Sequence, residues 1–239
     1  MIRFLLGTIA LAAVGTTMAD PNPERARERM VKEIKAFAAG IGDQLRLSDA
    51  VLDALGKVPR HLFVPLSLGA AAYANRPLAI GHGQTISQPY IVALMTDLLE
   101  PRKDDVVLEV GTGSGYQAAV LAELVHHVYS IEIVAPLAAE AVPRLKRLGY
   151  DNVTVREGDG YAGWPEHAPF DAIIVTAGAP HIPPPLVEQL KPGGHMVIPV
   201  GATRARQELI LVEKRGDGEI RKRNLGPVAF VPLTGARGE

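Results

Sequence analysis

A glycine-rich run is the first segment of this chain whose residue types could do chemistry. Residues 111–115 read GTGSG and directly follow an apolar run that ends at Val110. Glycines at such a turn let the backbone pass close to a ligand. The dinucleotide fingerprint needs its third glycine one position later, where this chain has Tyr116. The spacing therefore favours a nucleoside without a pyrophosphate over NAD.

Two carboxylates follow at positions where strands are expected to end. Glu132 ends the next apolar run, where a carboxylate can accept both hydroxyls of a ribose. Asp159 lies between Gly158 and Gly160 after the third run and could accept the amino group of an adenine. Each signal alone is weak, because such glycine turns and strand-end acids are often only turns and solvated groups. Together they predict an adenosine pocket.

The elements that must position these residues are short β-branched runs that alternate with helical stretches from residue 105 onward. Most runs are continuously apolar, as expected of parallel strands that are covered on both faces. The predicted fold class is α/β, a doubly wound, mostly parallel seven-stranded sheet with helices on both faces. The strands are expected at 106–110, 128–133, 153–155, 172–175, 196–200, 209–212 and 228–231, and the helices at 115–124, 134–148 and 184–190.

The segment before the sheet predicts an N-terminal helical extension. Residues 24–37 and 90–99 have helical periodicity, and Ser48 is a candidate N-cap for a helix over 49–55. Residues 73–89 are rich in Gly, Pro, Asn and Gln, which predicts an ordered loop. We expect residues 20–100 to form one compact unit with the α/β domain of residues 101–239.

The first nineteen residues have the layout of a secretory signal peptide. Arg3 is their only charge, an apolar run extends from Phe4 to about Val14, and small residues end the segment at Ala19. The run is too short for a stable membrane anchor, although an uncleaved N-terminal anchor stays an alternative. These residues predict a cleaved segment 1–19, no stable membrane insertion after cleavage, and a periplasmic or secreted protein.

Composition narrows the possible partners. The 239 residues carry a formal net charge of −1, which argues against sequence-independent binding to nucleic acid. There is no cysteine, and the seven histidines show no metal-ligand spacing, so no metal is expected. Neither Ser114 nor Ser87 lies in a G-x-S-x-G elbow, which leaves little support for a serine hydrolase.

Several motifs resemble the protein-L-isoaspartate methyltransferase family. Residues 107–116 (VLEVGTGSGY) look like its first motif, and Glu132 and residues 158–160 look like its second and third. Residues 76–90 (RPLAIGHGQTISQPY) resemble a family loop that methyltransferases in general do not share. Further matches lie at 58–65, 176–180, 190–194 and 230–234, so the resemblance covers about residues 44–234. Ala79 and Gly178 depart from the Pro and Ala that are frequent in bacterial members.

The resemblance implies a class I methyltransferase fold and S-adenosylmethionine as methyl donor. The acceptor would be the free carboxylate of L-isoaspartyl residues in damaged proteins and peptides, with repair through a succinimide. The resemblance also points to Ser87 and Thr85 as the catalytic residues. Substrate contacts would come from Gln84, Ile86, Val231, Pro232 and Leu233, and donor contacts from Glu109, Gly111, Thr112, Gly113, Gly115, Glu132, Asp159 and Gly160.

Three questions stay open at the level of sequence. A methyltransferase for a small molecule or another protein site would share the donor pocket but not the 84–89 segment. An exported binding protein that has lost catalysis would need a damaged donor site, and the expected residues are all present. The family is usually cytoplasmic, which is the alternative to export, and we expect a monomer.

Overall fold

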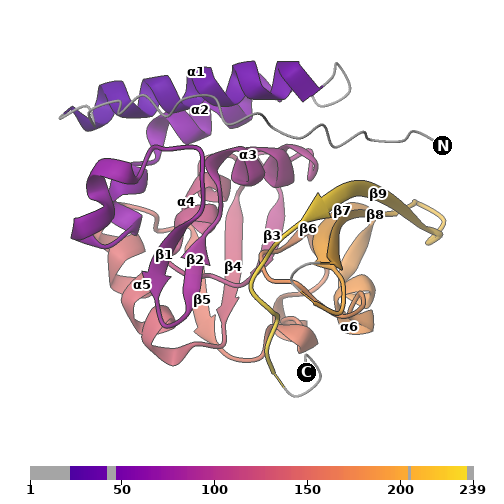
Figure 1. Cartoon of the computed structure of the whole chain (residues 1–239). Coiled ribbons are helices and arrows are strands. Elements are labelled where there is room, and N and C mark those ends of the chain that lie inside the picture. The colour runs from indigo at the N-terminus through magenta and orange to yellow at the C-terminus, as the bar shows by residue number, and fades with distance from the viewer. Residues whose placement is uncertain (1–21, 42–46, 204–205, 236–239) are drawn as a thin grey trace.

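A seven-stranded sheet forms the centre of the computed structural model, which describes residues 22–41, 47–203 and 206–235 (Figure 1). The predicted signal segment 1–19 lies outside the described residues. The strand order is β5-β4-β3-β6-β7-β8-β9, with β5 to β7 parallel and the last two strands antiparallel. The mostly parallel, doubly wound sheet is therefore confirmed. The strands are β3 (Val106–Val110), β4 (His127–Glu132), β5 (Val153–Glu157), β6 (Phe170–Val175), β7 (Leu190–Val200), β8 (Gln207–Lys214) and β9 (Ile220–Val228).

The seventh strand was predicted in the wrong place. It was expected at 228–231, but the sheet ends with β9, which pairs with β8 from Ile220 to Val228. This edge strand reads IRKRNLGPV and is mostly exposed or half-buried. Charged side chains are common on edge strands because they discourage pairing with other chains. Without an apolar run, the strand left no hydrophobic signal to detect.

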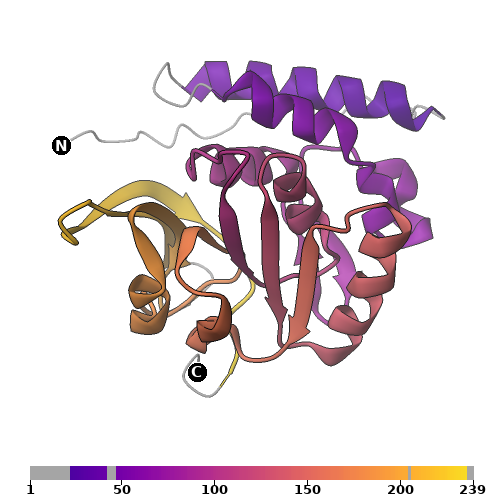
Figure 2. The same ribbon diagram turned by 180° about the vertical axis from the view of Figure 1, so that it is seen from behind.

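Helices of very different length cover the two faces of the sheet (Figures 1 and 2). One face carries the longer helices, and the other carries α6 (Pro184–Glu188) and the 3₁₀ helix η4 (Gly160–Ala162). The N-terminal extension is confirmed, and Ser48 accepts a hydrogen bond from Val51 N at 3.4 Å as the N-cap of α2. None of the described helices is both long and apolar enough to cross a membrane. The longer helices are α1 (Pro23–Ile41), α2 (Asp49–Lys57), α3 (Pro89–Asp97), α4 (Tyr116–Ala122) and α5 (Ala135–Arg147).

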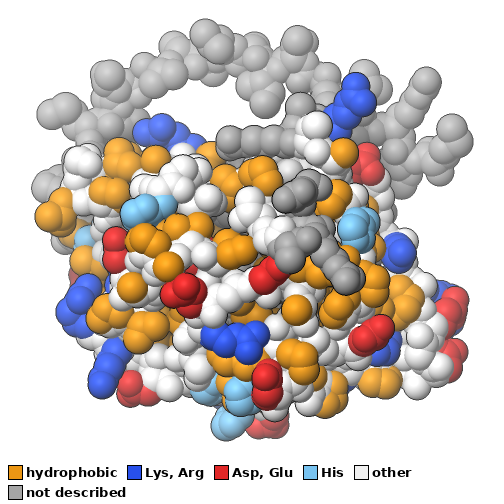
Figure 3. Space-filling view, turned by 90° about the horizontal axis from the view of Figure 1, so that it is seen from below, with side chains coloured by type: hydrophobic (Ala, Val, Ile, Leu, Met, Phe, Trp, Pro, Cys, Tyr) orange, Lys and Arg blue, Asp and Glu red, His pale blue; other side chains and the backbone are white. Residues whose placement is uncertain are grey.

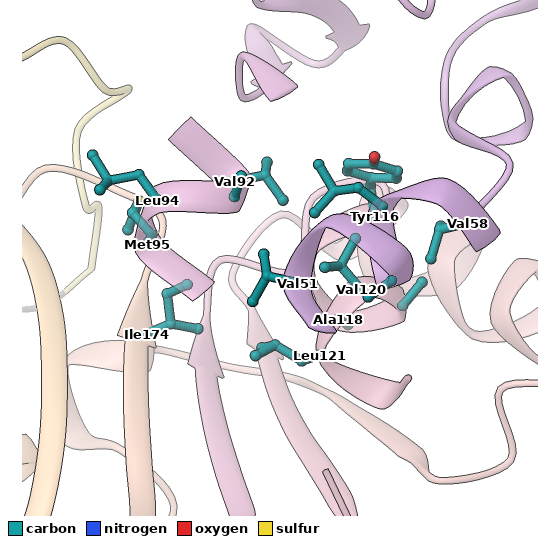
Figure 4. Packing of buried hydrophobic residues seen from close by; sticks show 14 of the residues in the cluster. Val51, Val58, Val92, Leu94, Met95, Tyr116, Ala118, Val120, Leu121 and Ile174 are labelled. Atoms are coloured by element: carbon teal, nitrogen blue, oxygen red, sulfur yellow. The ribbon is translucent and has the colours of Figure 1, made fainter. Parts of the chain in front are cut away.

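Buried side chains on both faces explain the unbroken apolar runs of the central strands. In β6, Ile174 belongs to the cluster under the longer helices, whereas Ile173 belongs to the cluster on the opposite face. Figure 4 shows labelled residues of α2, α3 and α4 in the same cluster as Ile174 of β6. The same cluster includes residues of α1 such as Ile34 and of the sheet such as Val107. The N-terminal helices and the sheet therefore share one core.

The segment expected as an ordered loop contains a hairpin, β1 (Leu78–Gly81) and β2 (Gln84–Ile86). Leu78 pairs with Ile86 and the strands run antiparallel. The turn residues His82 and Gly83 have φ values of 52° and 73°. Tight hairpins favour such positive-φ pairs, and glycine is the usual second residue. The strands are too short to outweigh the Gly and Pro content of the segment in a sequence-based prediction.

Residues 230–234, which we call the C-terminal strap, leave β9 and cross the carboxyl edge of the sheet. Gly178 N donates to Val231 O, and Leu233 N donates to Gly178 O, both at 2.8 Å. The side-chain amide of Gln207 also binds Phe230 twice, accepting from its N at 2.6 Å and donating to its O at 3.3 Å. A Cβ at Gly178 would overlap this amide. The glycine therefore leaves room for the Gln207 side chain, and we call its two hydrogen bonds to Phe230 the Gln207 clamp.

Gly178→Ala should destabilise the fold by about 1–3 kcal/mol, because the added methyl group displaces Gln207 from a buried site. Denaturant unfolding measures this change. Gly69→Ala is the matched control, since a Cβ at Gly69 meets no atom within 4 Å. Equal stability of the two variants would contradict the clamp.

Candidate active site

A cavity opens where the parallel strands end, at the edge on which nucleotide-like ligands bind in open α/β sheets. It combines the glycine turn after β3, the end of β4, the β1–β2 hairpin and the C-terminal strap. Many of the predicted site residues meet here, although they come from all parts of the chain. The lining residues are Gln84, Thr85, Val110, Gly111, Gly113, Ile131, Glu132, Ile133, Val134, Gly160, Thr176, Ala177, Val231, Pro232, Leu233 and Thr234.

The glycine turn needs glycine for two physical reasons. Gly111 and Gly113 have φ values of 99° and 53°, a region that side chains with a Cβ rarely adopt. A Cβ at Gly111 would also overlap Thr176 Oγ1. That hydroxyl donates to Gly111 O at 2.7 Å, which ties the ends of β3 and β6 together. The backbone of the turn therefore forms a bare wall of the cavity.

Glu132 lies at the end of β4 and is 5% exposed. One carboxylate oxygen accepts from Gly113 N at 2.6 Å, and the other accepts from Val134 N at 2.9 Å. A carboxylate offers about four lone-pair sites, so about two remain for a ligand. Glu132 lines the cavity and can still accept both hydroxyls of a ribose.

Glu109 does not line the cavity but lies behind the glycine turn, where it is fully buried. Ser130 Oγ donates a short hydrogen bond to Glu109, and Ser130 in turn bonds Thr112 Oγ1 at 2.5 Å. Burial, with the nearby Glu132, raises the pKa of Glu109 to about 8. The side chain is therefore mainly protonated at neutral pH. Glu109 thus supports Thr112 through Ser130. Direct contact of Glu109 with the donor stays a prediction.

Asp159 and Gly115 also lie outside the lining of the cavity. Asp159 caps the helix η4 by accepting from Tyr161 N at 2.9 Å, and Gly235 packs against its carboxylate. Gly115 is the N-cap of α4, with a φ of 89°, and faces Leu145. Gly160 lines the cavity, and a Cβ there would overlap Val110. The predicted donor contacts of Asp159 and Gly115 are therefore not visible in this arrangement and stay predictions.

A smaller cavity adjoins the first one and contains the hydroxyl residues of the hairpin region. Thr85, Gly111, Gly113 and Thr176 line both cavities, so the two share a wall. Ser87 lines the smaller one only. The lining of the smaller cavity is completed by Ile86, Val92, Thr112, Ser114, Tyr116 and Gln117. An acceptor that is held near Ser87 would thus lie beside the glycine turn.

The substrate residues predicted from the resemblance lie at the cavities as well. Gln84 and the strap residues Val231, Pro232 and Leu233 line the larger cavity, and Ile86 lines the smaller one. Sequence reasoning missed Thr176, which lies at the end of β6 and touches both cavities. Its place directly after a predicted strand was the available signal, since ligands gather at strand ends where the strand order reverses.

The surface around this edge carries charges of both signs. Figure 3 views the molecule from the side to which the parallel strands point, and Lys, Arg, Asp and Glu side chains are interspersed there. The described side chains on this face therefore do not form the single-sign field that attracts a nucleic-acid backbone. Among the described residues, no group of three or more His, Asp or Glu side chains is placed to hold a metal ion.

Comparisons with known proteins agree with this geometry. One relative, a protein-L-isoaspartate O-methyltransferase of Syntrophobacter fumaroxidans, is 58% identical over 238 residues, which cover 98% of this chain and 96% of the relative. Another, from a Polaromonas species, is 65% identical over 191 residues, which cover 80% of this chain and 90% of the relative.

Solved structures of the same kind of enzyme superimpose on most of the chain. A protein-L-isoaspartate O-methyltransferase matches 89% of this chain and 67% of its own, with a TM-score of 0.77 and 30% identity. A Plasmodium falciparum protein is described as a putative enzyme of this type in complex with S-adenosyl-L-homocysteine. It matches 87% of this chain and 98% of its own, with a TM-score of 0.71 and 27% identity. The model of the protein-L-isoaspartate(D-aspartate) O-methyltransferase family matches residues 33–238, and the chain belongs to that family.

Proposed function

We propose that this chain transfers a methyl group from S-adenosylmethionine to the free carboxylate of L-isoaspartyl residues in damaged proteins. The observation that carries the proposal is the shared wall between the two cavities. Gly111, Gly113 and Thr176 separate the side that contains Glu132 from the side that contains Ser87. A donor on Glu132 and an acceptor beside Ser87 would therefore meet across the glycine turn.

The donor side fits an adenosine without a rearrangement of Glu132. The carboxylate is already fixed by two backbone amides and keeps lone pairs for ribose hydroxyls. The glycines at 111, 113 and 160 keep side chains out of the space beside it. The bound donor supplies a methyl group on a sulfonium, and the residues of this chain determine where the acceptor oxygen lies.

The acceptor side needs alignment and no general base. A side-chain carboxyl with a pKa near 4 is already ionised at neutral pH. What the protein supplies is the direction of the attacking oxygen and the removal of part of its water, and positioning can contribute on the order of 7 kcal/mol. The hydroxyls of Ser87 and Thr85 suit this task, because a cation would hold the carboxylate too firmly in its ground state.

Part of the larger cavity suits the polypeptide that carries the acceptor carboxylate, so this polypeptide and the donor would share the larger cavity. The strap residues Val231, Pro232 and Leu233 line this cavity together with Gln84 and contribute backbone and apolar side chains. Such a surface holds an extended segment through its main chain, which is what many different damaged proteins have in common. In the methyl ester, the following backbone nitrogen attacks the ester carbonyl, methanol leaves, and the resulting succinimide opens partly to normal aspartate.

We also propose that the enzyme is a monomer, does not bind nucleic acid, and works outside the cytoplasm after removal of residues 1–19. The support for export is the layout of Arg3, the apolar run and Ala19. The alignment with the Syntrophobacter relative covers 98% of the chain, so most of the N-terminal segment falls within the matched region.

The defining assay is the transfer of labelled methyl from S-adenosylmethionine to an isoaspartyl peptide and to its aspartyl twin. We expect label in the isoaspartyl peptide only. Equal labelling of both peptides, or labelling of neither, would overturn the proposed acceptor and favour a methyltransferase with another substrate.

Glu132→Ala should weaken donor binding by about 1–3 kcal/mol, or roughly 5- to 150-fold, because two ribose hydroxyls lose their acceptor. Isothermal titration calorimetry measures this affinity. Glu157→Ala is the control, since Glu157 pairs in register with Glu132 at the end of β5 but is exposed. Unchanged affinity in Glu132→Ala would show that the donor binds elsewhere.

Ser87→Ala should lower kcat by about 10- to 1,000-fold, with little change in donor affinity, since a positioning contact is lost. The variant should keep the wild-type pH dependence across neutrality, because the nucleophile stays ionised above about pH 5. Steady-state kinetics from pH 6 to 9 provide the test, with the exposed Ser67→Ala as control. Loss of a step that titrates near pH 7 would instead place Ser87 in an acid–base relay.

The mature protein should begin at Asp20, because small residues precede that position at the end of the signal-like segment. N-terminal sequencing of protein from fractionated cells measures this. Intact Met1 in the soluble cytoplasmic fraction would refute both cleavage and export.

A further inference from the structure

A buried cation lies directly behind the loop that contains Ser87. Arg60 is the largest fully buried side chain among the described residues, with no exposed surface. Burial lowers its pKa to about 10, so it stays charged at neutral pH. In the part of the chain that the structure describes, no acidic side chain forms an ion pair with it. Burying a charge without a counter-ion is costly, so this position calls for an explanation.

The guanidinium of Arg60 joins two segments that are distant in sequence. Its Nε donates to Ala72 O at 2.8 Å, and its Nη2 donates to Ser87 O at 2.7 Å. The guanidinium carbon lies 4.7 Å from the ring centre of Tyr116, a residue that lines the same cavity as Ser87. The planar fork of arginine can reach both carbonyls at once, which the single ammonium of lysine does less well.

Few other contacts fix the position of Ser87. Only Ser87 and Gln88 connect β2 to α3, and Pro89 begins the helix without a backbone donor. The N-cap residue Gln88 makes no side-chain hydrogen bond to α3, but Asn75 Oδ1 accepts from Tyr90 N at 3.0 Å. Asn75 thus anchors the helix side of the connection. The carbonyl of Ser87 itself is held by Arg60.

We propose that Arg60 is a positioning residue for the methyl transfer, which acts by holding the Ser87 backbone so that the hydroxyl points at the acceptor carboxylate. The inference rests on the proposed function of Ser87. It assigns to Arg60 no contact with either substrate. If Arg60 acts only through Ser87, a change at Arg60 should have no further effect on turnover once the Ser87 hydroxyl is removed. The effects of residues that act as a unit are not additive.

The test is a double-mutant cycle with Arg60→Lys, Ser87→Ala and the double variant, assayed with an isoaspartyl peptide. Lysine keeps a basic side chain but lacks the planar guanidinium that can bind both carbonyls at once. We expect Arg60→Lys to lower kcat by about 10- to 100-fold, with donor affinity by calorimetry unchanged within about two-fold. The double variant should be no slower than Ser87→Ala within about three-fold. Arg147→Lys, on the exposed end of α5, is the matched control and should behave as wild type.

Two outcomes would overturn the inference while leaving the proposed function intact. In the first, the wild type methylates the isoaspartyl peptide but the losses of the single variants multiply in the double variant, which would mean that Arg60 does not act through Ser87. In the second, Arg60→Lys weakens donor binding as much as it slows turnover, as a general loss of structure would. A wild type that does not methylate the isoaspartyl peptide would instead overturn the proposed function.

Discussion

The contact between the carboxyl ends of β3 and β6 is the constraint on which the rest of the site depends. These strands are neighbours in the sheet although their connections run in opposite directions, and the Thr176 hydroxyl donates to the carbonyls of both Val110 and Gly111. No Cβ fits at Gly111 beside that hydroxyl. Gly111 also has a positive φ, and the glycine turn that it begins lies between the two cavities.

The carboxylates around the turn support its backbone, and only one of them reaches the cavity. Glu132 joins the glycine turn to the start of α5 through two backbone amides and keeps acceptor capacity on the cavity side. Glu109 lies deeper, and its raised pKa reflects full burial. A protonated Glu109 limits the repulsion that a second negative charge would exert on Glu132. Two acids of the same neighbourhood thus have different tasks because one reaches the cavity and the other does not.

The two cavities are lined by segments from both ends of the chain. The β1–β2 hairpin belongs to the N-terminal extension, and the strap follows the last strand. A side chain binds backbone groups of each segment. Arg60 donates to the Ser87 carbonyl in the connection after the hairpin, and the Gln207 amide binds Phe230 in the strap. Since the N-terminal helices and the sheet share one buried cluster, the hairpin is held firmly against the glycine turn.

The sequence by itself determined the local features of this protein. Continuous apolar runs identified the parallel strands, the glycine spacing identified the turn, and Glu132 was placed by its position at the end of a strand. Features without a periodic apolar signal were decided only by the tertiary structure. The polar edge strand β9 and the short hairpin depend on backbone pairing with the neighbouring strand, and the buried Arg60 depends on the carbonyls of Ala72 and Ser87, which lie in other segments. Periodicity reports which face of an element is buried, whereas only the folded chain determines which backbone groups a buried side chain can reach.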